Sequence, residues 1–277
     1  MKLDKRFEIL IEYIILMLFV GFALLPVLWM ILTSIRTPLE YFSSPPTLLV
    51  KNPTLDNYAK FFNDARFVQY FSNSLIVSIT SAFLSTLISA LAGYGFSRFD
   101  FKLKDILFIS VIFCQMVPLM AIIMPLYDMM SRMKLIDSPL ALILSYFIIT
   151  LPFSTWMCRA AFKQVPMNIE EAALIDGCSR LKAIFKVVLP VAAPAMAAIF
   201  LYCFIQAWNE YVLAMTLINS TSKRTIQVGI MLYRGEYYTD WGMLMTASTV
   251  ASVPIMILFM IVQKYMISGL AAGAAKG

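Results

Sequence analysis

The chain contains no histidine, and this absence removes several classes of function. Histidine is the commonest general base, the usual proton switch near neutral pH and the commonest metal ligand. The cysteines Cys114, Cys158, Cys178 and Cys203 are far apart and have neither zinc-site nor disulfide spacing. No GxxxxGKS or GxxxxGKT phosphate loop occurs either. We therefore expect no catalytic residue, no metal site and no cofactor in this chain, and we do not expect an enzyme.

Charge is also scarce. Only 14% of the 277 residues are charged, 61% are hydrophobic and the mean hydropathy is +0.80, whereas soluble domains are roughly half apolar. The net charge is +6, but the Lys and Arg residues stand in short clusters beside apolar runs, without an aromatic-interleaved basic patch. The composition predicts an all-α membrane protein and argues against a nucleic-acid partner.

Six apolar runs are long enough to cross a bilayer, which needs about 20 residues per helix. The third run contains Pro118 and Pro125, which predict a kinked helix whose freed carbonyls need partners inside the protein. We expect one membrane domain over residues 1–277. The predicted spans are about residues 10–34, 73–96, 106–130, 140–162, 191–217 and 243–267.

The distribution of Lys and Arg predicts the orientation. With the N-terminus inside, the inner segments carry more Lys and Arg than the outer ones, and the outer charges are spread over long loops, where the positive-inside rule counts them less. We therefore expect both termini, and the segment 166–190, to be cytoplasmic.

The segment 166–190 is polar and has the pattern of two short helices. Asn168 and Glu171 have capping-box spacing and predict a helix start. Gly177 predicts a left-handed residue that ends this helix, and Ser179 can cap the next one. These patterns alone leave two interpretations open, a helix pair that docks into a groove on another protein and a connector that lies on the membrane surface.

The same segment reads EAA, three residues, Gly, nine residues, then Val-x-Leu-Pro. In this pattern it resembles the cytoplasmic loop of ATP-binding-cassette importer permeases, where isoleucine usually stands at the Val187 position. The resemblance implies that the loop docks into a cleft of an ATPase subunit and couples the two proteins. The residues to which it assigns this coupling are Glu170, Glu171, Ala172, Ala173, Asp176 and Gly177.

The resemblance covers nearly the whole chain. The order of spans, the WNEY at 208–211 and the C-terminal GLAAGAAKG look like the carbohydrate-uptake branch, specifically its maltose-type second permease. This implies a related second permease, two ATPase subunits that bind ATP and Mg²⁺, and an extracytoplasmic solute-binding protein, in the cytoplasmic membrane of a bacterium or archaeon. It also implies that the loop 219–241 can enter the binding protein and that the tail, with Gly273, Lys276 and Gly277, reaches the ATPase dimer.

Polar side chains within the spans predict a route for a neutral polar solute, because amides, hydroxyls and aromatic faces bind sugars. The same groups could instead bond helix to helix, and in some maltose-type systems the other permease makes most of the sugar contacts. The candidates are Gln115, Tyr146, Thr150, Tyr202, Gln206, Asn209 and Glu210.

Three alternatives differ from sugar import. A polyamine permease would need acidic groups along its path, and only Asp128 and Glu210 are available. A membrane assembly or signalling protein with a partner-docking loop would explain segment 166–190 but not the polar fifth span. An independent channel or proton-coupled carrier is disfavoured by the missing histidine and the few intramembrane charges.

Overall fold

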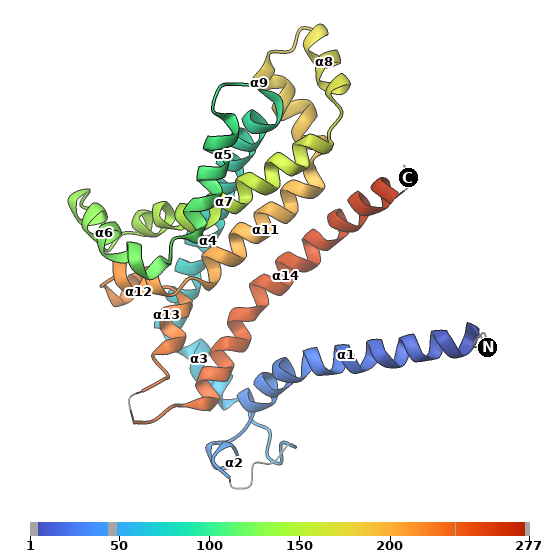
Figure 1. Ribbon diagram of the computed structural model, residues 1–277. Helices are drawn as coiled ribbons and strands as arrows, with labels where there is room; N and C mark the ends of the chain where they lie inside the picture. The colour runs from blue at the N-terminus through green and yellow to red at the C-terminus, as the bar shows by residue number, and fades with distance from the viewer. Residues whose placement is uncertain (1–4, 44–48, 236, 275–277) are drawn as a thin grey trace. The chain divides into compact units, whose positions relative to one another are not determined.

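The computed structural model describes the backbone of residues 5–43, 49–235 and 237–274 (Figure 1). Within these ranges the regular structure is helical, and the only strand-like pairing is one antiparallel bridge between Arg234 and Thr239. This confirms the predicted all-α fold class. The longer helices are α1 (Lys5–Ser34), α4 (Ala65–Arg98), α5 (Lys104–Phe113), α6 (Leu119–Arg132), α7 (Pro139–Gln164), α8 (Met167–Ile175), α11 (Ala193–Asn209) and α14 (Trp241–Ala274). The shorter ones are α2 (Pro38–Tyr41), α3 (Asp56–Asn63), η1 (Cys114–Met116), α9 (Arg180–Ala183), η2 (Ile184–Val188), α10 (Leu189–Val191), α12 (Val212–Leu217), η3 (Thr221–Lys223) and α13 (Ile226–Met231).

Four helices are long and apolar enough to span a membrane without interruption. They are Ile9–Ser34, Ala65–Arg98, Pro139–Gln164 and Trp241–Tyr265. Two further spans are broken helix pairs, so the described residues contain four to six membrane helices, depending on whether each pair counts as one span.

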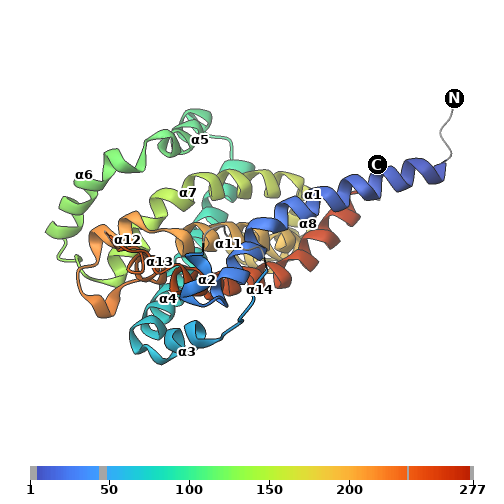
Figure 2. The ribbon, with the colours of Figure 1, turned by 90° about the horizontal axis from the view of Figure 1, so that it is seen from below.

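Prolines explain both breaks. In the third span, Lys104–Met116 and Leu119–Arg132 meet at 99°, and Pro118 stands at the start of the second piece. This confirms the expected interruption, and both pieces lie on the same side of α7 in Figure 2. The fifth span differs from the continuous helix expected over 191–217, because α11 ends at Asn209 and α12 begins at Val212, with Glu210 extended (ψ 125°) after α11. A second break lies at the start of this span. Arg180–Val191 and Ala193–Asn209 meet at 86°, because Pro194 has no amide hydrogen to continue the helical bonding across Ala192.

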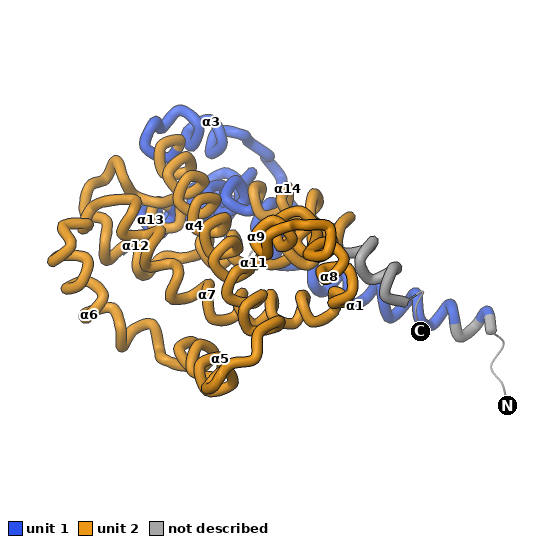
Figure 3. The backbone as a smooth tube through the Cα atoms, turned by 90° about the horizontal axis from the view of Figure 1, so that it is seen from above, with its two compact units in different colours: residues 1–67, 230–252 blue, residues 68–229, 253–277 orange. Residues whose placement is uncertain are grey.

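The chain forms two compact units, drawn in different colours in Figure 3. The first comprises residues 1–67 and 230–252, and the second residues 68–229 and 253–277. In the first unit the connection after α1 is folded tightly. The side-chain amide of Asn57 donates to the carbonyls of Ser34 (3.0 Å) and Arg36 (3.3 Å). The buried Glu40 carboxylate accepts from the backbone amide of Asn52 (2.6 Å). A Cβ on Gly242 would come within 2.8 Å of Asn57 Nδ2, so α14 begins in direct contact with this connection.

In the second unit, small residues bring α4 and α7 into close contact. Ser85 bonds to Thr150 (2.8 Å), and one helical turn later Ser89 bonds to Ser154 (2.5 Å). A further turn on, a Cβ on Gly93 would come within 2.8 Å of the Arg159 backbone nitrogen. The contact therefore repeats every four residues along both helices, and the small side chains let the two backbones approach closely.

The connection between α6 and α7 is tied to the one after α12 by Asp137. Its carboxylate accepts from the amides of Asn219 (3.1 Å) and Ser220 (2.8 Å), from the Ser220 hydroxyl (2.5 Å) and from Lys223 Nζ (3.2 Å). The hydrogen bond from the Ser220 side chain, followed by its backbone amide, lowers the pKa of Asp137. Asp137 thus fixes two loops that are more than 80 residues apart in the sequence.

We expect Asp137→Asn to lower the thermal unfolding temperature of the detergent-solubilised protein at pH 7. A carboxyl whose pKa is lowered by folding stabilises the fold above its unfolded value, about 4, and this contribution is lost as the pH falls below that value towards the folded pKa. The difference between the variant and the wild type should therefore shrink below about pH 4. The control is Asp128→Asn, because Asp128 pairs with exposed Arg132 in the next turn (2.8 Å) and such pairs contribute little. Equal unfolding temperatures for Asp137→Asn and the wild type at pH 7 would contradict this role.

Candidate functional site

The first helix of segment 166–190 is α8, and it begins without a side-chain cap. Pro166 takes the N-cap position with ψ 136° and the helix starts at Met167. Asn168 is therefore already inside the first turn, where it cannot accept the bonds of an N-cap residue. The predicted capping box between Asn168 and Glu171 is wrong, because the proline sets an extended entry two residues before the expected start.

The turn after α8 agrees with the prediction. Gly177 has φ +83°, its amide donates to Leu174 O (3.1 Å), and the next amide, of Cys178, donates to Ala173 O (3.0 Å). This pair of bonds is a Schellman motif, which needs a left-handed residue at the Gly177 position. A Cβ on Gly177 would meet no atom within 4 Å. The requirement for glycine is therefore conformational, not steric.

The second helix of the segment starts as predicted. The Ser179 hydroxyl accepts from the Lys182 amide (3.4 Å) at the N-terminus of α9, and the chain continues through a π turn (η2) and α10 before the break at Ala192. The Arg180 guanidinium lies 5.0 Å from the ring centroid of Phe99, just beyond α4.

The predicted coupling residues divide into two groups. Glu171, Ala172, Asp176 and Gly177 are exposed, whereas Glu170 and Ala173 are buried. Ile175, the last residue of α8, is 86% exposed, so α8 and its turn present an apolar side chain together with the carboxylates of Glu171 and Asp176.

Glu170 points into the protein. Its carboxylate accepts from Arg98 Nε (3.0 Å) and from the Tyr94 hydroxyl, both at the end of α4. Arg98 Nη2 also donates to the carbonyl of Val165, the C-cap residue of α7 (2.8 Å). The side chains of Arg98 and Glu170 are only 7% and 9% exposed. Sequence reasoning missed this cluster, because no local sequence pattern pairs residues 72 positions apart.

Three of the predicted path residues have internal roles. Thr150 bonds to Ser85 and to its own helix at Tyr146 O (2.8 Å). Glu210 is buried, and its carboxylate accepts from the amides of Leu213 (2.7 Å) and Ala214 (3.0 Å) in the first turn of α12. Tyr146 is fully buried near the Glu210 carboxylate. The helix-to-helix alternative fits these residues.

Of the other four path residues, three lie together. The Tyr202 hydroxyl on α11 lies near the Gln206 side chain and near that of Gln115, at the break of the third span, and both glutamines are exposed. The Phe153 ring is 4.8 Å from that of Tyr202 and 5.3 Å from that of Trp156. Sequence reasoning missed Phe153 and Trp156, although aromatic residues near prolines in a polar span were a usable signal. Asn209 is exposed at the end of α11.

We name the five residues Gln115, Phe153, Trp156, Tyr202 and Gln206 the amide–aromatic group.

The predicted tail is described only in part. Gly273 lies in α14, whereas Lys276 and Gly277 are outside the described residues. Among the residues the structure does describe, no group of three or more Cys, Asp or Glu side chains could hold a metal ion.

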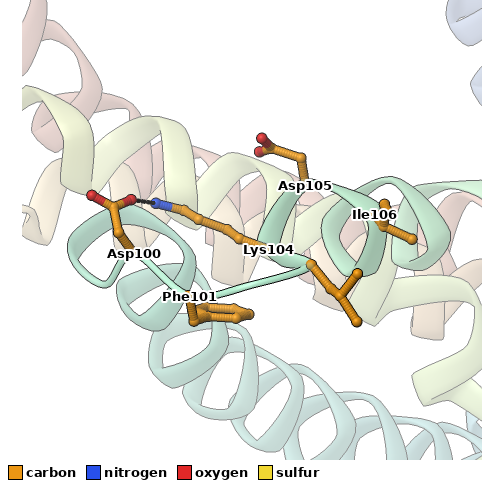
Figure 4. A pocket seen from close by; sticks show the side chains of 6 residues that line it. Asp100, Phe101, Lys104, Asp105 and Ile106 are labelled. Carbon is orange, nitrogen blue, oxygen red and sulfur yellow. Dashed lines mark hydrogen bonds and ion pairs between the residues drawn. The ribbon is translucent and has the colours of Figure 1, made fainter.

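A shallow pocket lies at the connection between α4 and α5 (Figure 4). Lys104 Nζ bonds there to Asp100 Oδ1 (2.9 Å), and the Asp100 side chain is fully exposed. None of the predicted site residues lines this pocket, whose lining is Asp100, Phe101, Leu103, Lys104, Asp105 and Ile106.

Comparison with known proteins identifies a family and several related transport proteins. Residues 85–271 match the family described as "Binding-protein-dependent transport system inner membrane component". The chain is 37% identical to the sulfoquinovosyl glycerol transport system permease protein SmoH of Agrobacterium fabrum, over 92% of this chain and 89% of that protein. It is 35% identical to the trehalose/maltose transport system permease protein MalG of Thermococcus litoralis, over 92% of both chains. It is 30% identical to the diacetylchitobiose uptake system permease protein DasC of Streptomyces coelicolor, over 94% of both.

The fold has been seen before in a solved transporter. A chain of a bacterial ABC transporter involved in the import of the acidic polysaccharide alginate matches with a TM-score of 0.80 and 21% identity, over 96% of this chain and 99% of that one. The family match covers more than half of the sequence and includes α8, its glycine turn and α9. The chain is a multi-pass membrane protein and belongs to the binding-protein-dependent transport system inner membrane components, the permeases of ABC importers.

Proposed function

We propose that this chain is a permease subunit of an ATP-binding-cassette importer that moves a sugar or oligosaccharide, delivered by an extracytoplasmic binding protein, across the cytoplasmic membrane of a bacterium or archaeon. The observation that carries the proposal is the helix, glycine turn and helix of residues 167–183, which leaves Glu171, Ala172, Asp176 and Gly177 exposed. Relatives named for transport of sulfoquinovosyl glycerol, trehalose and maltose, and diacetylchitobiose support a saccharide as the solute.

The proposed assembly contains a second, related permease and two ATPase subunits, which bind ATP and Mg²⁺. With both termini on the cytoplasmic side, α8 and its turn face the ATPase. The exposed Ile175 would enter an apolar site on that subunit, while Glu171 and Asp176 meet basic groups or helix N-termini at its edge. Closure of the ATPase subunits on ATP would then displace the helix pair.

Transport should be measured in sealed vesicles that contain the chain together with the products of its neighbouring genes, with labelled oligosaccharides outside and ATP inside. ATP-dependent accumulation supports the proposal. Accumulation that persists without ATP or without the neighbouring proteins would contradict it and indicate an independent carrier.

We expect Gly177→Val to abolish uptake and co-purification of the ATPase subunits, while the protein still inserts in the membrane. A β-branched residue at φ +83° is strained, although there is space for its side chain. The matched control is Gly177→Asn, because asparagine tolerates the left-handed region and should keep most of the uptake. Normal uptake by Gly177→Val would show that the turn geometry is not needed for docking.

The amide–aromatic group supports a route for a sugar along this chain. Exposed amides are costly against lipid, so Gln115 and Gln206 are expected to face a polar route or another protein. The group also offers amides, a phenol and the partly exposed indole of Trp156, which together hydrogen-bond to and stack on neutral sugars. It contains no carboxylate, which disfavours a polyamine as the solute.

We expect Gln206→Ala to raise the KM of uptake roughly fivefold, which corresponds to the loss of one hydrogen bond worth about 1 kcal/mol. Trp156→Ala should raise it further, and Trp156→Phe, which keeps an aromatic face, should largely restore it. The control is Asn209→Ala, an exposed amide on the same helix but outside the group. If the KM is unchanged in both alanine variants of the group, the sugar passes along other residues.

A further inference from the structure

Glu170 stands next to the motif that faces the ATPase in the proposed function, yet its carboxylate is used entirely inside this chain. Tyr94, Arg98 and Glu170 form one buried hydrogen-bonded cluster, which we name the α4–α8 clamp. We propose that the clamp is the link that makes the end of α4 move with α8, so that Arg98 and Tyr94 are positioning residues for the coupling of ATP hydrolysis to transport. This inference rests on the proposed function.

The clamp bridges the short connection between α7 and α8. The helix α7 ends at Gln164, and only Val165 and Pro166 separate it from α8. One guanidinium holds both sides of this connection, because Arg98 bonds to Val165 O through Nη2 (2.8 Å) and to Glu170 through Nε (3.0 Å). Arginine suits this task since its donors lie in a rigid plane. The ends of α4 and α7 and the start of α8 are thus joined at one side chain.

Burial makes the clamp stiff. If α8 moved without α4, Arg98 and Glu170 would each become a buried charge without its partner, which is strongly unfavourable. The Tyr94 ring is held in place edge-on by Phe99 (5.9 Å between centroids) and Phe162 (6.1 Å). In the nearby Lys104–Asp100 pair the Asp100 side chain is fully exposed, so water can replace its partner and this pair cannot resist a displacement in this way.

The test uses the full complex, with its permease partner, ATPase subunits and binding protein, in proteoliposomes. The quantity measured is the number of solute molecules transported per ATP hydrolysed, together with the amount of ATPase subunit bound per permease. We expect Glu170→Gln to lower the transport ratio roughly tenfold, within the usual range of coupling between sites, with the ATPase subunits still bound. Tyr94→Phe, which removes one hydrogen bond and keeps the ion pair, should lower it less. Asp100→Asn is the matched control on the neighbouring connection and should behave as the wild type.

A purely structural role would change the amount of assembled complex without changing the transport ratio of what assembles. An unchanged ratio in the assembled Glu170→Gln complex therefore overturns the inference. If Glu170→Gln does not assemble, Tyr94→Phe decides, and an unchanged ratio in that variant overturns it as well. These results differ from a failure of the proposed function, in which the wild-type complex itself shows no ATP-dependent uptake.

Discussion

The close contact between α4 and α7 is the constraint on which the second unit depends. Ser85, Ser89 and Gly93 repeat every four residues along α4 and let the two backbones approach. Further along the same helix, next to this row of small residues, Tyr94 and Arg98 reach the end of α7, where Val165 O and the Glu170 carboxylate accept their hydrogen bonds. A change of register at Ser85 would therefore be felt at α8, more than three helical turns away.

Polar groups in the spans show how backbone and side chains share hydrogen bonds in an apolar region. The Glu210 carboxylate accepts from two amides of α12 that have no helical partner, just after α11 ends. The Thr150 hydroxyl bonds to the backbone one turn earlier and to α4. In both cases a side chain forms hydrogen bonds with backbone groups or with a neighbouring helix. Irregular backbone inside a membrane domain requires that its polar groups be satisfied within the protein in this way.

Local signals made the sequence informative about some features and not others. Gly177, Ser179 and Pro118 act within a few residues, so the turn, the second helix start and the break in the third span could be predicted. The sequence could not separate a buried packing residue such as Thr150 from an exposed amide such as Gln206, because burial depends on which residues face each side chain in the fold. The Arg98–Glu170 pair depends on how three helices meet, and nothing within either local segment indicates it. The capping box failed because a proline two residues upstream outweighed a correct spacing.

Segment 166–190 is joined to the rest of the second unit at its other end as well, through the break at Ala192. The helical stretch that starts at Arg180 passes into α11 through this one residue, at an angle of 86°. Because the two pieces meet at nearly a right angle, a displacement along the axis of the first piece is directed across the axis of the second. A movement of α9 and α10 along their axis would therefore push the start of α11 sideways, and Tyr202 and Gln206 lie on that helix.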